Sequence, residues 1–140
     1  MAISFFSEDT SFSVKNKRLL TSWIKTCIAA EEKKLGEISF IFCSDQYLLS
    51  INRQYLQHDY FTDVITFDYS DGISVAGDVF ISVDTVKENS SLFEKDFLNE
   101  LHRVIIHGVL HLCGHGDKSD EEAAKMRLLE DKNLSLLPNK

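Results

Sequence analysis

The sequence has little of what separates a chain into independent units. Only one of its 140 residues is proline and six are glycine, and we find no repeated or low-complexity segment. Linkers between domains are usually rich in proline, glycine and small polar residues. The composition therefore predicts one domain over residues 1–140, which is long enough to bury a hydrophobic core of its own.

Long apolar runs are also missing. No segment approaches the roughly 18 consecutive apolar residues that a membrane-spanning helix needs. Residues 1–13 lack the basic start and apolar centre of a secretory signal peptide. Hydrophobic residues make up 44% of the chain and charged residues 26%, as in an ordinary globular domain. We therefore expect a cytoplasmic protein that does not bind membranes.

Cysteine pairs and a positive charge excess are absent as well. Cys27, Cys43 and Cys113 are too widely spaced for a CxxC motif, so we expect small buried hydrophobic residues, with packing favoured over metal binding for Cys113 too. The 22 acidic and 15 basic residues give a net charge of −7. This balance argues against general electrostatic binding of nucleic acid, although a local basic groove is compatible with it.

Hydrophobic periodicity predicts an α+β fold, in which a small mixed four-stranded sheet packs with helices. Strands are expected at residues 3–6, 37–43, 64–69 and 77–83, the last two as an antiparallel pair. Helices are expected from about residue 19 to Gly36, from Ser44 or Asp45 through Tyr55, over 94–113, and from a Ser119–Glu122 capping box to about Asp131. The segment 57–63 has no periodicity and is expected to be a loop.

Residues 107–117, which read HGVLHLCGHGD, are typical of a metal site at the end of a helix. His107 and His111 are four residues apart, so both imidazoles share one helix face. Gly114 can end the helix and turn the chain back. A third ligand from this turn leaves one metal position open for water, which is the arrangement of catalytic rather than structural zinc.

Two residues compete to be the third ligand. Asp117 follows His107 by ten residues and His115 follows it by eight. In metzincin-type sites the third ligand is the tenth residue after the first, because the chain needs about three residues beyond the glycine to return to the metal. Spacing therefore favours Asp117, with His115 as a residue of the surrounding pocket or the alternative ligand.

The residue after the first histidine also bears on the reaction. Zinc proteases of the HExxH type have their general base there, whereas this chain has Gly108. Peptide hydrolysis by that mechanism is therefore disfavoured. We also expect Gly108 to leave room beside the metal for a substrate group.

Four segments together resemble one known family. HGVLHLCG at 107–114 resembles the signature HGxLHLxG of the YbeY family, the metal-dependent endoribonucleases of ribosomal RNA maturation. Residues 49–55 resemble its LNxxY segment, TDVITF at 62–67 its TDVLSF, and GDVFIS at 77–82 its GDI strand. The segments occur in the family's order and span nearly the whole chain.

The resemblance implies a zinc-dependent endoribonuclease that cleaves single-stranded RNA in the late maturation of 16S ribosomal RNA and in ribosome quality control. It implies one zinc ion per chain, held by His107, His111 and Asp117. The implied partners are ribosomal RNA and the small ribosomal subunit or its proteins.

The chain departs from the family pattern at two positions. Asp117 stands where the family has its third histidine, and Leu56 stands where it has an arginine that is thought to contact the phosphate. Arg53 and Arg103 are our candidates to replace that cation. The expected catalytic set is His107, Arg103 and Arg53.

Further residues have two interpretations. Asp63 and Asp78 could orient ligands or accept a proton, although Asp63 could equally cap a turn. Tyr60 and Phe61 could stack on bases or pack in the core. His102 is expected to be exposed.

Two rival functions are a non-catalytic ribosome-assembly factor with a structural metal and a metallopeptidase-like hydrolase of small substrates.

Overall fold

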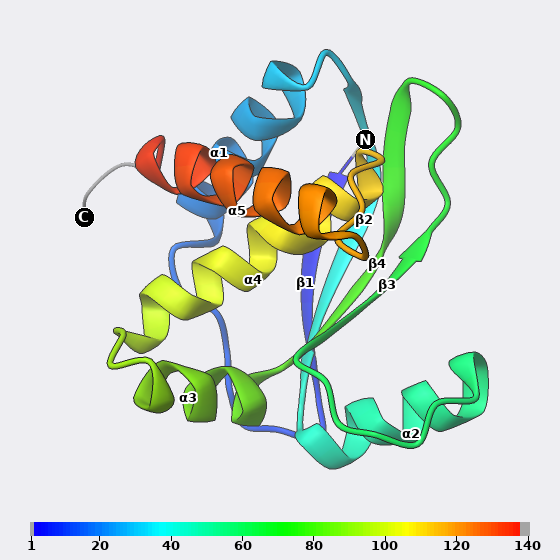
Figure 1. Ribbon diagram of the computed structural model, residues 1–140, viewed down its shortest axis with the longest axis vertical. Helices are drawn as coiled ribbons and strands as arrows, with labels where there is room; N and C mark the ends of the chain where they lie inside the picture. Colours follow the sequence, from blue (N-terminus) through cyan, green and yellow to red (C-terminus); the bar gives the residue numbers. More distant parts are fainter. Residues whose placement is uncertain (1, 138–140) are drawn as a thin grey trace.

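A computed structural model describes residues 2–137, so the first residue and the last three of the predicted 1–140 domain lie outside the described part (Figure 1). The fold is α+β, with a mixed four-stranded sheet, as the sequence predicts. The strands are β1 (Ala2–Glu8), β2 (Lys34–Cys43), β3 (Val64–Asp68) and β4 (Ser74–Ser82). The helices are α1 (Lys17–Ala30), α2 (Asp45–Leu56), α3 (Val83–Leu92), α4 (Phe97–Leu112) and α5 (Asp120–Ser135).

The sheet has the strand order β1-β2-β4-β3. β1 and β4 both run parallel to β2, whereas β3 pairs antiparallel to β4, with Ile65 opposite Phe80. The predicted antiparallel pair is therefore confirmed. Parallel neighbours need a long crossover connection, which is α1 between β1 and β2, and α2 followed by β3 between β2 and β4.

Side chains alternate between the two faces of the sheet, and different helices pack on each face. The main core joins Phe40 and Phe42 of β2 and Val79 of β4 to buried residues of α1 and α4. A second, smaller cluster packs Leu48 and Ile51 of α2 against the opposite face. Figure 1 shows α2 apart from the other helices. The site discussed below lies on the side that carries α4 and α5.

Several boundaries differ from the sequence-based expectations. The first helix ends at Ala30 rather than near Gly36, because Glu32 takes a left-handed backbone conformation and the chain from Lys34 onward pairs with β4. Helix α3 was not predicted, and it directly follows β4, capped by Ser82. The last helix continues to Ser135.

His102 is also placed differently from its prediction. It is buried rather than exposed, because its ring lies edge-on against Trp23, with 6.0 Å between the ring centroids. The indole of Trp23 in turn donates to the carbonyl of Asn133 across 2.8 Å. These contacts join α1, α4 and α5 behind the site.

Within residues 2–137, none of the helices combines the length and the apolar character that crossing a bilayer would take.

Candidate metal centre

The C-terminal end of α4 presents the two histidines and then reverses the chain. The helix ends at Leu112, and Gly114 takes a φ of 104°, which an L side chain rarely adopts. The amide of Gly114 donates to the carbonyl of His111, and that of His115 to the carbonyl of Leu110. These bonds close the helix end. The turn predicted at this glycine is confirmed, and it brings the chain back over the last turn of α4.

The turn places Asp117 against both imidazoles. Its Oδ2 atom lies 3.4 Å from Nε2 of His107 and 3.5 Å from Nε2 of His111. Ligands held about 2.0 to 2.2 Å from a tetrahedral zinc ion are themselves about 3.3 to 3.6 Å apart. The carboxylate oxygen therefore lies at this separation from each nitrogen donor, all three ligand atoms lie within 4.8 Å of one another, and the donor set fits a metal.

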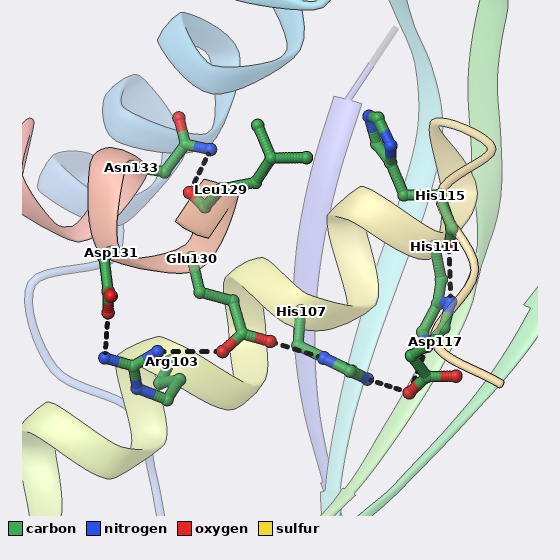
Figure 2. Close-up of polar contacts among 9 residues, drawn as sticks. All are labelled: Arg103, His107, His111, His115, Asp117, Leu129, Glu130, Asp131 and Asn133. Atoms are coloured by element: carbon green, nitrogen blue, oxygen red, sulfur yellow. Dashed lines mark hydrogen bonds and ion pairs between the residues drawn. The ribbon is translucent and has the colours of Figure 1, made fainter. Parts of the chain in front are cut away.

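Hydrogen bonds hold both rings so that their Nε2 atoms face this point, as Figure 2 shows. Nδ1 of His107 lies 2.6 Å from Oε2 of Glu130. Nδ1 of His111 lies 2.8 Å from the carbonyl oxygen of His115. Both partners are acceptors, so each neutral ring has its proton on Nδ1 and a lone pair on Nε2. This is the tautomer in which Nε2 can bind a metal.

His115 itself points elsewhere. Its Nε2 lies 2.5 Å from Oε1 of Glu31, at the end of α1. In the part of the chain that the structure describes, His107, His111 and Asp117 form the only group of three or more such residues whose ligand atoms all lie within 4.8 Å of one another. His115 thus contributes its backbone carbonyl, which orients His111, and its side chain fastens the turn to α1.

Glu130 was not singled out from the sequence, although it is central to the site. It lies on α5 and is 6% exposed. Besides contacting His107, it accepts from Arg103 across 2.8 Å, and Arg103 also contacts Asp131 at 2.6 Å. The sequence feature that could have identified Glu130 is its spacing in the helix. Met126, Glu130 and Asn133 lie on one face of α5, and that face is buried. A carboxylate on the inward stripe of a helix is rarely left without a partner.

The charges of this network shift two pKa values in opposite directions. Burial acts to lower the pKa of His107, but the hydrogen bond and charge of Glu130, with smaller contributions from Asp117 and Asp63, raise it above its ordinary value. Burial acts to raise the pKa of Glu130, but His107 and Arg103 lower it. Without a metal, the pair therefore favours a protonated imidazole beside an ionised carboxylate.

A cavity of about 270 Å³ opens beside His107 and Asp117. Its other lining residues are Asp63, Glu100, Arg103, Val104, Arg127 and Glu130. The pKa of Asp63 is raised, chiefly by burial, although the charge of His107 opposes the shift. Burial and the charge of Asp63 raise the pKa of Glu100, against the opposing charges of Arg103 and Arg127. The cavity thus combines candidate metal ligands, two arginines and two carboxyl groups, those of Asp63 and Glu100, with a raised pKa.

Some of the other predicted site residues line this cavity and others lie outside it. Arg103 lines it, whereas Arg53 does not and instead pairs with Asp59 next to α2. Asp63 lines it, whereas Asp78 accepts a hydrogen bond from Tyr69.

Gly108 does not leave room beside the metal, so that expectation was wrong. A Cβ atom at this position would lie 2.7 Å from Cγ1 of Val79 and 3.6 Å from Cγ2 of Thr66. The missing side chain therefore faces the sheet, and glycine is needed because α4 packs closely on β4.

The loop 57–63 exposes aromatic side chains rather than burying them. Tyr60 is 55% and Phe61 53% exposed, which excludes the core-packing alternative. The loop is nevertheless held in place. Asn52, which is buried, donates to the carbonyl of Tyr60 across 2.9 Å, and the ring of Tyr60 stacks on His58. Two residues after Phe61, the loop reaches Asp63 in the cavity wall.

Comparison with known proteins places these features in one family. The model of the family described as Endoribonuclease YbeY matches residues 3–137. A Parabacteroides distasonis protein named Endoribonuclease YbeY is 50% identical over 138 residues, covering 99% of this chain and 97% of its own. A Bacteroides fragilis protein of the same name is 52% identical over 136 residues, covering 97% of this chain and 98% of its own.

A solved structure has a similar fold. The solution structure of TM1509 from Thermotoga maritima has a TM-score of 0.69 and 25% identity to this chain, covering 97% of this chain and 89% of TM1509. The family match extends over almost every described residue, including the strands, the loop before Asp63, and the helix end that carries His107 and His111. The resemblance inferred from the sequence is confirmed: this chain belongs to the YbeY endoribonuclease family.

Proposed function

We propose that residues 1–140 form one metal-dependent endoribonuclease domain, which hydrolyses single-stranded RNA at a zinc ion held by His107, His111 and Asp117. The observation that carries the proposal is the convergence of the three donor atoms beside an open cavity. Membership of a family whose relatives are named endoribonucleases supports the choice of RNA as substrate.

The proposed cellular role is late maturation of 16S ribosomal RNA and ribosome quality control in the cytoplasm, with ribosomal RNA and the small subunit or its proteins as partners. The support for this role is the family resemblance of the four sequence segments.

A metal ion at this site would lower the pKa of bound water and polarise the phosphodiester. The residues of the chain hold and orient the reactants. Glu130 and the carbonyl of His115 fix the two imidazoles, and Asp117 supplies a negative charge. His107 therefore has its catalytic role through its Nε2 atom, which must be free of a proton for the site to be loaded.

Asp63 is the proposed proton acceptor for the attacking water. Its carboxylate lies in the cavity wall, and its raised pKa makes it a stronger base than an ordinary aspartate. When the water oxygen attacks phosphorus, its proton passes to the Asp63 carboxylate, the bond from phosphorus to the ribose oxygen breaks, and the leaving oxygen takes up a proton from solvent water to become a hydroxyl group. Of the two cations predicted from the sequence, Arg103 lines the cavity and is proposed to act by holding Glu130, whereas Arg53 pairs with Asp59 outside the cavity and is left out of the proposed catalytic set.

The preference for unpaired RNA is assigned to the loop. Aromatic rings stack on bases that are not already stacked in a duplex. Tyr60 and Phe61 are exposed on a held segment that continues into the cavity wall. Such rings favour a single strand over a duplex without selecting a particular base.

The test is cleavage of a labelled single-stranded oligoribonucleotide by the zinc-loaded protein and by His111→Ala. We expect His111→Ala to lose both zinc and cleavage while keeping its fold, measured by circular dichroism. Lys125→Gln on the exposed face of α5 is the matched control and should cleave like the parent. No cleavage by the parent, together with unfolding of His111→Ala, would support the assembly factor with a structural metal instead.

The metallopeptidase alternative is less well supported. The similar proteins are named endoribonucleases rather than peptidases. Position 108 also offers no general base, because it faces β4. Cleavage of a peptide substrate by the zinc-loaded protein, in the absence of RNA cleavage, would reverse this preference.

A further inference from the structure

The residues that line the cavity include more acids than bases, which opposes the entry of RNA. Four acidic residues line it, Asp63, Glu100, Asp117 and Glu130, against two arginines and one histidine. A phosphodiester that enters carries a further negative charge. A side chain with an uncommitted positive charge is therefore needed to hold the phosphate beside the metal.

Arg103 is poorly placed for this task. Its NH1 atom contacts Glu130 at 2.8 Å and its NH2 atom contacts Asp131 at 2.6 Å. Two carboxylates thus occupy its guanidinium, and the hydrogen bond to Glu130 is part of the network that orients His107. Turning Arg103 toward a phosphate would break both ion pairs.

Arg127 is differently placed. It lines the same cavity, and within residues 2–137 its guanidinium makes neither a hydrogen bond nor an ion pair, although its charge acts on Glu100 in the cavity wall. It lies on α5 three residues before Glu130, and residues at this spacing share a helix face. Glu130 reaches inward to His107, so the preceding turn of the same face places Arg127 at the mouth of the cavity, where it is exposed.

We infer that Arg127 binds the phosphate group of the RNA strand that occupies this cavity, and so provides the cation of the site from α5. The inference rests on the proposed function, because it takes RNA as the ligand. Arginine is suited to the task, since its planar guanidinium can donate two parallel hydrogen bonds to phosphate oxygens. Arg53, by contrast, lies outside the cavity and pairs with Asp59.

The experiment compares the zinc-loaded parent with Arg127→Gln, Arg127→Lys, Arg53→Gln and the control Lys125→Gln. Binding of a labelled single-stranded oligoribonucleotide is measured by fluorescence anisotropy over a range of salt concentrations, and cleavage by gel. We expect Arg127→Gln to lower kcat/KM about 10- to 100-fold. The slope of log Kd against log salt should fall by about 1, with zinc content and thermal unfolding unchanged.

The other variants separate a phosphate contact from a structural role. Arg127→Lys should restore the salt slope and part of the rate, because it keeps the charge but not the paired donors. Arg53→Gln and Lys125→Gln should match the parent. The inference is overturned if Arg127→Gln binds and cleaves like the parent, or if Arg53→Gln alone binds and cleaves less well.

The proposed function and this inference fail in different ways. If the parent binds RNA with a salt slope that depends on Arg127 but does not cleave it, the phosphate contact stands and the endoribonuclease proposal fails. If the parent cleaves RNA and Arg127→Gln is unchanged, the endoribonuclease proposal stands and the role of Arg127 is refuted. If the parent neither binds nor cleaves RNA, both are refuted.

Discussion

At the scale of single residues, the site depends on which nitrogen of each histidine carries the proton. Glu130 accepts a hydrogen bond from Nδ1 of His107, and the carbonyl of His115 accepts one from Nδ1 of His111. Such acceptors raise the basicity of the ring and fix its orientation toward a metal. The acceptor for His111 is backbone, so no side-chain change removes it. The acceptor for His107 is a side chain and can be tested.

Replacing Glu130 by glutamine should weaken zinc binding about 10- to 100-fold, because the acceptor behind His107 is no longer charged. Competition against a chromophoric chelator measures the affinity. The control is Asp131→Asn, which removes the outer partner of Arg103 and leaves Glu130 in place; it should change the affinity much less. Equal zinc affinities for the parent and Glu130→Gln would contradict the role given to Glu130.

The candidate ligands could be predicted from the sequence, but the residue that orients them could not. Spacing alone places His107 and His111 on one face and favours Asp117 over His115, because all of these lie within one helix end and its turn. Glu130 is 23 residues beyond His107 and reaches it only because α5 packs against α4. Local periodicity contains no information about which two helices meet.

At the scale of elements, α4 must lie close to the sheet for its C-terminal end to support the site. Gly108 permits the approach, since a Cβ atom there would meet Val79 at 2.7 Å. Val79 is fully buried and β-branched, so it has little freedom to move away.

The change Gly108→Ala should therefore lower the free energy of unfolding by about 1 to 2 kcal/mol. Overpacking a buried site costs about 1 to 3 kcal/mol, and the better helix propensity of alanine offsets up to about 1 kcal/mol of that. Urea unfolding monitored by circular dichroism measures the difference. An alanine variant at least as stable as the parent would show that α4 is less tightly packed than described.

The loop between α2 and β3 is the second element whose role can be tested. We expect Tyr60→Ala and Phe61→Ala each to weaken binding of single-stranded RNA, by roughly 1 to 3 kcal/mol for each base that stacks on the ring. Duplex RNA binding should change little. The matched control is Tyr69→Ala, which removes another exposed aromatic ring outside this loop. Equally weakened binding in all three variants would point to a general rather than a local effect.

Elements can be predicted where a pattern is both long and locally capped. The periodicity of α4 and the Ser119 capping box of α5 indicate helices, and both are present. Helix α3 escapes prediction because it is short, follows a strand without a loop, and buries only three residues, Val83, Val86 and Ser90. The early part of β2 gives no strand signal, because its strand character comes from pairing with β4 rather than from its own alternation.

At the scale of the whole molecule, the core forms without the metal site. The main cluster of buried residues joins four helices to one face of the sheet and does not include the candidate ligands, of which His107 and His111 are half-buried and Asp117 is exposed. Fold class follows from the sequence, because the number and type of elements limit the architecture. The strand order, with β4 between β2 and β3, depends on long-range pairing that no local pattern specifies.

The buried thiols make the stability of the fold depend on pH. Burial is the main cause that raises the pKa of Cys27, Cys43 and Cys113 from 9.0 to about 12. The unfolded chain releases these protons near pH 9, whereas the folded chain retains them. The free energy of unfolding should therefore hold up to about pH 9 and fall as the pH rises from 9 toward 12.

Thiol titration checks this prediction directly. The native protein at pH 8 should react slowly with a thiol reagent at all three cysteines, and the urea-unfolded protein should react at once. The variant Cys27→Ala should lose stability less steeply above pH 9 than the parent, because one titrating group is gone. Fast reaction of the native protein at pH 8 would show that these thiols are not buried.

The central claim is that Asp117, and not His115, completes a metal site with His107 and His111. Equilibrium zinc titration of the parent, Asp117→Asn and His115→Ala tests it most directly. The account predicts one zinc ion per chain in the parent, binding weakened at least tenfold in Asp117→Asn, and one zinc ion bound with near-parent affinity in His115→Ala. Loss of zinc in His115→Ala with unchanged binding in Asp117→Asn, or no zinc binding by the parent, would contradict it.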